Sequence, residues 1–85
     1  MTGGENLKTQ LLKSYRVRVG ITQKVLAKLL QIDVTTYSKK ENGVIEFKAS
    51  EILILKKTLN LTPIEIDEIF FNSSVEFNST NIEAI

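Results

Sequence analysis

Side chains suited to acid–base or nucleophilic chemistry are scarce in this chain. Its 85 residues include no histidine and no cysteine, which removes the commonest general base, the commonest metal ligand and any thiolate site. The acidic residues fall mostly on expected helix surfaces and form no convergent set with a nucleophile. We therefore expect that the protein is not an enzyme, and that it binds no metal ion, no cofactor and no small-molecule ligand.

A different chemistry is suggested by short side chains that recur within residues 34–42. At spacings of one, three and four, a helix carries them on one face, pointing away from Ile32 and Tyr37. The residues of this face are Val34, Thr35, Thr36, Ser38 and Lys39. Such a face can approach the edges of DNA bases closely, and an apolar side chain on it can contact a thymine methyl group. The pattern favours recognition of double-stranded DNA, although each residue could also be an ordinary surface position.

Two short helices must position this face. Thr22 can cap a helix over residues 23–30, and Asp33 can cap a second helix over residues 34–41 or 34–42 that Gly43 ends. The segment 22–43 is therefore laid out as a helix-turn-helix, in which one helix braces and the next enters the major groove. The first of these helices should bury Leu26, Ala27, one of Leu29 and Leu30, and Val25, while Ile32 plugs the turn.

Three further helices complete an all-α, compact five-helix domain over residues 1–71. The first, over about 6–19, has an apolar stripe and is ended by Gly20; the stripe comprises Leu7, Leu11, Leu12, Tyr15 and Val19. The fourth, over about 49–59, has only poor capping residues at its start (Lys48 or Ala49); it should bury Ile52, Leu55 and Leu59. In the connector before it, Ile45 and Phe47 should pack inward.

The fifth helix has the clearest start signal, because Thr62-Pro63-Ile64-Glu65 combines a capping threonine, a proline at the first position and a capping-box glutamate. It should reach residue 70 or 71 and bury Ile66, Ile69 and Phe70. Residues 72–85, rich in Asn, Ser and Thr, form a tail that could be a dimerising segment, a short strand at 75–77, or disordered.

Composition and charge agree with an intracellular DNA-binding protein. The 42% hydrophobic and 25% charged content is that of a globular domain, and the absence of a signal or membrane-spanning segment predicts a cytoplasmic location. Residues 1–43 hold eight Lys or Arg against three acids, a balance of +5, and residues 44–85 hold three Lys against seven acids, a balance of −4. One half could thus face a polyanion while the other stays free.

The residues of segment 22–43 also carry a resemblance to the lambda-repressor-like, Cro-type (XRE) helix-turn-helix family. The matching residues are Thr22-Gln23, Leu26-Ala27, Leu30, Ile32 and Glu41-Asn42-Gly43. The likeness extends over about residues 7–71, and the string at 36–43 resembles a variant common among phage and mobile-element regulators.

The resemblance implies roles for individual residues. Similar proteins use the positions of Val34, Thr35 and Lys39 for base contacts, with Thr36 and Ser38 nearby, and those of Gln23 and Asn42 at the phosphates. In similar proteins the pair matching Arg16 and Glu41 is a partly buried ion pair, which predicts a structural role for both. For Lys39, base readout and nonspecific phosphate attraction both stay open.

Three positions depart from the family pattern. Gln31 occupies the turn position usually filled by glycine, so we expect a left-handed, non-glycine residue there. Lys40 replaces a commonly apolar residue; its alkyl stem should cover the core while its ammonium reaches solvent or phosphate. Tyr37 replaces an aliphatic residue and should be buried with its hydroxyl at the edge.

The predicted function is a sequence-specific transcriptional regulator, a repressor, that binds two half-sites as a homodimer. Its pairing surface should lie in the fifth helix and the tail, where apolar residues have little core left to join (Phe71, Val75, Phe77, Ile82 and Ile85). The alternative is a protein-interaction module, such as an antitoxin or an adaptor, that retains the fold. The basic Lys39-Lys40 edge and the division of charge argue against a purely protein-facing role.

Overall fold

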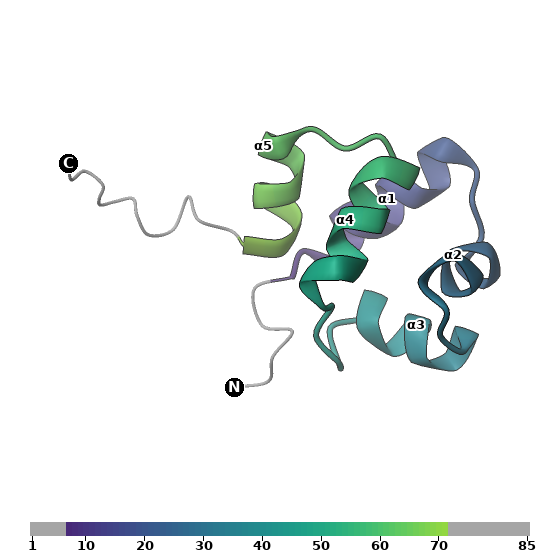
Figure 1. The fold of residues 1–85 in the computed structure, drawn as a ribbon. Helices are drawn as coiled ribbons and strands as arrows, with labels where there is room; N and C mark the ends of the chain where they lie inside the picture. The colour runs from purple at the N-terminus through teal and green to yellow at the C-terminus, as the bar shows by residue number, and fades with distance from the viewer. Residues whose placement is uncertain (1–6, 72–85) are drawn as a thin grey trace.

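The structure, a computed structural model, describes residues 7–71 of the chain. Five helices follow one another in this part and no strand interrupts them, so the all-α prediction is confirmed. They are α1 (Thr9–Val19), α2 (Gln23–Leu30), α3 (Val34–Glu41), α4 (Ala49–Thr58) and α5 (Pro63–Ile66), which continues as the π-helical turn η1 (Asp67–Phe71). Figure 1 shows α5 at one end of the domain and α2 at the other. The predicted tail lies outside the described residues.

Short-range capping bonds set the starts of α2 and α3 where the sequence predicts them. The Thr22 hydroxyl accepts a hydrogen bond from the Val25 backbone N–H (3.2 Å), and the Asp33 carboxylate accepts one from the Thr35 N–H (2.8 Å). Each cap satisfies a backbone donor that has no partner inside its own helix. Because these signals need only neighbouring residues, they could be identified without tertiary structure.

The start of the first helix and the form of the last helical turn differ from the prediction. Helix α1 begins at Thr9, later than residue 6, and the Lys8 side chain makes no capping bond. The Lys8 N–H instead donates to the Ile69 carbonyl oxygen (2.8 Å), which joins the start of α1 to η1. Thr62 and Glu65 form the predicted capping box of α5, and helical structure reaches Phe71, but its last five residues widen into the π-helical turn.

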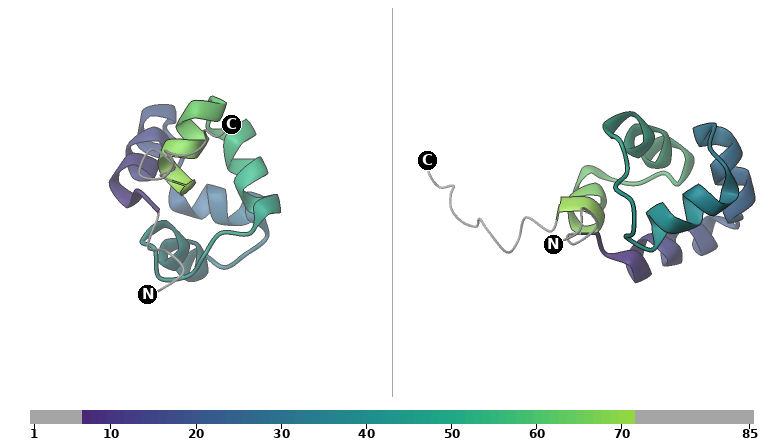
Figure 2. Two further views of the ribbon diagram at one scale, coloured as in Figure 1. Left: turned by 90° about the vertical axis from the view of Figure 1, so that its left-hand side faces the viewer. Right: turned by 90° about the horizontal axis from the view of Figure 1, so that it is seen from below.

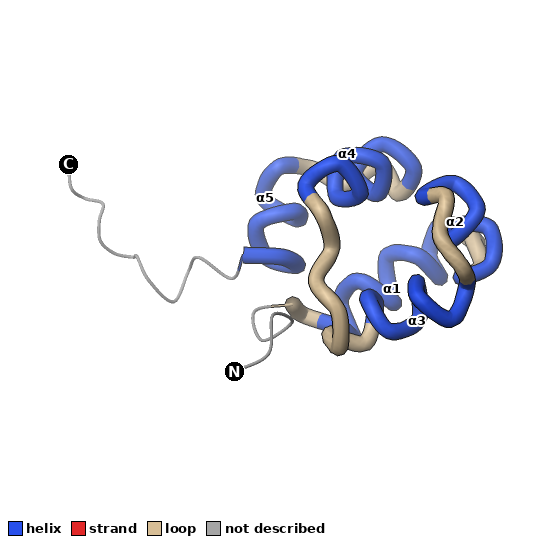
Figure 3. Tube along the Cα trace, turned by 60° about the horizontal axis from the view of Figure 1, so that its bottom comes forward, coloured by secondary structure: helices blue, strands red, loops and turns tan. Residues whose placement is uncertain are grey.

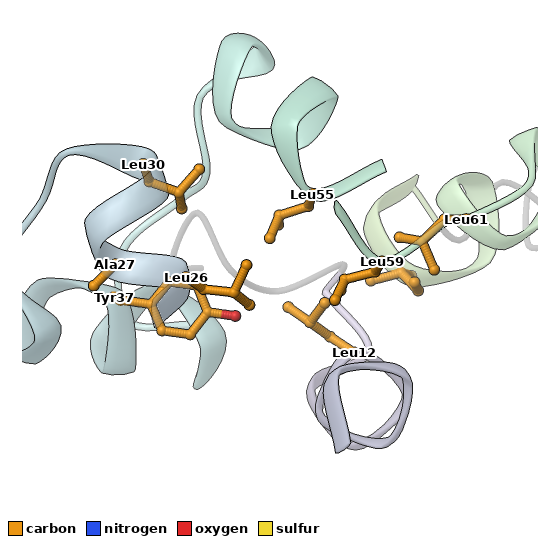
Figure 4. Packing of buried hydrophobic residues seen from close by; sticks show 9 residues of the cluster. Leu12, Leu26, Ala27, Leu30, Tyr37, Leu55, Leu59 and Leu61 are labelled. Carbon is orange, nitrogen blue, oxygen red and sulfur yellow. The ribbon is translucent and has the colours of Figure 1, made fainter. Parts of the chain in front are cut away.

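The core draws on all five helical segments. Its buried side chains are Leu12, Leu26, Ala27, Leu30, Tyr37, Leu55, Leu59, Leu61 and Ile69. Figure 4 shows the labelled members of this set converging from α1, α2, α3, α4 and the turn that follows α4. Phe47 packs against this cluster with its ring edge-on to Tyr37 and to Phe70, at centroid distances of 6.0 and 5.6 Å. The connector therefore contributes one inward-facing aromatic residue, as predicted for Phe47.

Three apolar residues expected in the core, Val19, Val25 and Ile45, are exposed instead. On α2, Leu26 and Leu30 occupy the buried stripe, so Val25, one position before Leu26, faces outward. Of the alternatives Leu29 and Leu30, Leu30 is the buried one. Val19 is the last residue of α1 and lies beyond the core contacts of that helix. Ile45 lies in the connector between α3 and α4, where Phe47 takes the inward position.

Helix α3 lies along the edge of the domain. It packs against α1 and α2, and Figure 2 shows from two further directions that its other side has no covering element within the described residues. Figure 3 shows the connector leading from the end of α3 across to the start of α4. This placement leaves one face of α3 available to a large partner.

Candidate nucleic-acid interface

The turn between α2 and α3 fixes the angle at which α3 is held. Gln31 adopts the predicted left-handed conformation (φ 60°, ψ 41°), with its N–H bonded to carbonyls of the preceding turn. The following Ile32 N–H donates to the Ala27 carbonyl oxygen (3.0 Å), and the Ile32 side chain packs against the core. Ala27 is itself buried. The turn is thus fixed by backbone bonds and by one apolar side chain.

The predicted reading face lies on the open side of α3. Three of its residues face outward: Val34, which is 40% exposed, Thr35 and Lys39. Two others, Thr36 and Ser38, are half-buried at the margins of this side. The opposite side of the helix is buried and consists of Tyr37, Lys40 and Glu41. The structure therefore brings the five predicted residues onto one accessible surface, which we call the reading face.

Asn42, predicted at the phosphates, follows the reading face directly. It is exposed and forms the C-cap of α3, with its backbone N–H bonded to the Ser38 carbonyl oxygen (3.0 Å). Its side-chain amide donates to Ser38 Oγ (3.4 Å). Both bonds fix Asn42 at the end of the reading face.

Glu41 joins α1, α2 and α3 behind the reading face. Arg16 Nε lies 2.8 Å from Glu41 Oε2, so the two side chains form an ion pair, and the Tyr37 hydroxyl donates to the same oxygen (3.0 Å). The amide of Gln23, the first residue of α2, donates to Glu41 Oε1. We call Arg16, Gln23, Tyr37 and Glu41 the Glu41 cluster.

The cluster keeps Glu41 ionised although its side chain is fully buried. Burial alone would raise the pKa of the carboxyl, but hydrogen bonds from Arg16 and Gln23 outweigh it and hold the pKa below its ordinary value of 4.5. Burial, and then the negative charge of Glu41, raise the pKa of the Tyr37 hydroxyl well above its ordinary value. At neutral pH the cluster thus contains a carboxylate, a guanidinium and a neutral phenol.

Tyr37 differs from the prediction, and Gln23 makes a contact that the sequence did not predict. The Tyr37 hydroxyl does not reach the edge of the domain, because its bond to Glu41 holds it inside. Gln23, expected at the phosphates, has its amide directed at Glu41 in the described structure. A Gln amide has two N–H donors, so this bond leaves a second donor for a phosphate oxygen.

The direction of the Lys40 side chain differs most from the prediction. Its ammonium reaches neither solvent nor a position where phosphate could bind, since the residue is only 5% exposed. Lys40 Nζ instead lies 2.7 Å from Glu51 Oε1 and donates to the Glu46 carbonyl oxygen (3.3 Å). An acid eleven residues along the chain, in the first turn of α4, draws the ammonium inward.

Glu51 is the partner of Lys40 that the sequence did not predict. Its carboxylate also accepts the Lys48 backbone N–H (2.8 Å), so it caps α4 where the residues at the helix start are poor caps. The spacing of Lys48 and Glu51 was the available signal, because a glutamate at the third helical position is one half of a capping box. Its bond to Lys40 had no comparable local signal.

Comparison with known proteins places the chain in a family. None of the helices in residues 7–71 combines the length and the hydropathy that a bilayer-spanning segment requires. No curated protein and no solved structure gives a significant match to the chain. A family model described as helix-turn-helix matches residues 12–66, which include α2, α3 and the turn between them. The chain belongs to the helix-turn-helix family in its lambda-repressor- and Cro-like (XRE) form, a family of DNA-binding regulators.

Proposed function

We propose that the protein is a sequence-specific transcriptional repressor whose helix α3 enters the DNA major groove. The observation that carries this proposal is the two-sided character of α3. Val34, Thr35 and Lys39 are exposed on one side, and the buried Glu41 cluster holds the other side against α1 and α2. A rigid helix that exposes a hydroxyl, a small apolar side chain and a lysine suits contact with base edges and thymine methyl groups.

Within this proposal the reading-face residues have separate roles. Val34, Thr35 and Lys39 contact bases, with Thr36 and Ser38 beside them, and Asn42 and Gln23 contact phosphates at the two ends. Arg16 and Glu41 hold the scaffold and do not touch DNA. Base contacts set which sequence is bound, whereas phosphate contacts set register and most of the salt dependence.

We further propose that the protein binds as a homodimer. A single recognition helix spans too few base pairs for selectivity, and two-fold pairing places two such helices on successive turns of DNA. Two large apolar side chains at the α5 end of the domain support this proposal: Ile64 is 72% exposed and Phe71 is 54% exposed. Ile64 belongs to α5, and Phe71 is the last residue of the π-helical turn η1 that continues it.

Operator selection followed by binding measurements tests the function. Genomic fragments captured by the protein would define the operator, and fluorescence anisotropy would compare that duplex with a random duplex over a range of salt concentrations. We expect tight operator binding that weakens steeply with salt. Lys39→Gln should weaken operator binding while leaving the unfolding temperature unchanged. Absence of binding to any duplex at low salt would contradict the proposal and favour a protein-interaction module.

A further inference from the structure

The Lys40–Glu51 pair bridges two helices that make little direct contact. Helices α3 and α4 both pack against α2 rather than closely against each other. The connector between them is largely exposed, and Val44, Ile45 and Glu46 all face outward. Lys40 Nζ and Glu51 Oε1, 2.7 Å apart, span this gap from the last turn of α3 to the first turn of α4.

The pair is enclosed and its geometry is closely defined. The side chains of Lys40 and Glu51 are only 6% and 7% exposed. The Phe47 ring lies beside the ammonium, with Nζ 6.0 Å from its centroid. The same glutamate oxygen accepts the Lys48 N–H. One carboxylate oxygen therefore joins α3, the end of the connector and the start of α4.

Stability alone does not account for a buried pair of this kind. Removing two charges from water costs about as much as their attraction returns, so apolar side chains of similar volume often give equal or greater stability. A directional ion pair differs from an apolar contact because it fixes distance and orientation. The end of α3 that it fixes is also the end that carries Lys39 and Asn42, two residues of the proposed DNA contact.

We propose that Lys40 and Glu51 are positioning residues that set the placement of the reading face for operator recognition. The pair holds the C-terminal turn of α3 at one distance from α4, and it directs one of two adjacent lysines inward, so that Lys39 alone is presented to DNA. This role rests on the proposed DNA-binding function. It assigns to Lys40 a part in sequence discrimination without any contact with a base.

The test is the double variant Lys40→Met with Glu51→Gln. Methionine retains the apolar stem, glutamine retains an oxygen that can cap Lys48, and the net charge of the chain is unchanged. We expect an unfolding temperature at or above that of the wild type and unchanged binding to random duplex. Operator binding should fall at least about tenfold, comparable to weakening one base contact.

A matched control is Lys57→Met with Glu46→Gln, which removes one exposed charge of each sign. It should retain wild-type discrimination between operator and random duplex. The single variant Glu51→Gln supplies a second readout. Lys40, without its carboxylate, should turn outward and add one phosphate contact, so the slope of log affinity against log salt should steepen by about 0.9.

The results of these experiments distinguish failure of the positioning role of Lys40 and Glu51 from failure of the proposed DNA-binding function. A folded double variant with wild-type discrimination would overturn the positioning role while leaving DNA binding intact. An unchanged salt slope in Glu51→Gln would overturn the part of the inference in which the charge of Glu51 directs Lys40 inward. Wild-type protein that binds no duplex would overturn both. Loss of discrimination in the control pair as well would show that surface charge, and not the Lys40–Glu51 geometry, sets recognition.

Discussion

Glu41 is the residue on which three helices depend. Its carboxylate is fully buried and receives bonds from Arg16, Gln23 and Tyr37. The three donors lie on three different helices, α1, α2 and α3. Loss of any one donor therefore leaves the buried negative charge of Glu41 with too few hydrogen bonds. The family resemblance implied the bond from Arg16, but those from Gln23 and Tyr37 emerged only from the packing.

Arg16→Ala should therefore reduce folding stability before it affects DNA chemistry. Removing one partner of a buried ion pair typically costs about 3–5 kcal/mol, since a buried charge is left unpaired. Denaturant unfolding followed by circular dichroism would measure the change. Lys13→Ala, at a half-buried position in the same helix, is the control and should change stability far less. Unchanged stability with lost operator affinity would instead make Arg16 a DNA-contacting residue.

Gln31 is the residue with the most unusual backbone conformation in the helix-turn-helix. A non-glycine residue in the left-handed region costs about 1 kcal/mol, so Gln31→Gly should stabilise the domain by up to that amount, less the entropy that glycine adds to the unfolded chain. Asn60, with φ of 56°, is a built-in comparison. Asn60→Gly should gain less because asparagine tolerates this conformation. Equal gains in thermal unfolding would argue against strain at Gln31.

At the scale of elements, the sequence predicted what is locally encoded. Thr22, Asp33 and the Thr62-Pro63 start each cap a helix with neighbouring atoms, so the starts of α2, α3 and α5 followed from the sequence. The direction of Lys40 and the exposure of Val25 depend on which helix lies alongside, and no local spacing contains that information. The reading face was predictable because it depends on helical spacing and on the family pattern.

Two buried carboxylates that connect helices, Glu41 and Glu51, should make the free energy of unfolding sensitive to acid. Hydrogen bonds from Lys40 and the Lys48 N–H outweigh the effect of burial and hold the pKa of Glu51 below its ordinary value of 4.5, as the Glu41 cluster does for Glu41. A carboxyl group whose pKa is lowered in the folded state stabilises the fold at pH values above the pKa that the group has in the unfolded chain. That contribution is lost as the pH falls through the folded-state value.

We therefore expect the free energy of unfolding to be constant near neutral pH and to fall below about pH 4.5. Urea unfolding at a series of pH values would measure it. The variant Glu51→Gln should show a shallower decline than the wild type, because one of the two linked carboxyl groups is gone. A decline of the same steepness would mean that other acids control the transition.

At the scale of the whole molecule, we expect the dimer formed through exposed Ile64 and Phe71 to place two reading faces on one operator. Ile64→Asp places a charge in the proposed pairing surface while leaving the core untouched, since Ile64 is exposed. We expect a folded monomer by analytical ultracentrifugation and weaker operator binding, with little change on a single half-site. Leu53→Asp, at an exposed position on α4, is the control and should stay dimeric. A variant at Ile64 that sediments like the wild type would place the pairing surface elsewhere.

The buried phenol of Tyr37 gives the domain an internal optical probe. The chain has two tyrosines and no tryptophan, and the pKa of Tyr37 is raised by burial and by the charge of Glu41. In alkali, Tyr37 can form a phenolate only as the Glu41 cluster opens, because burial and the adjacent carboxylate both disfavour a second negative charge there. Its ultraviolet absorbance would therefore report, without any added label, whether α3 is still seated against α1 and α2.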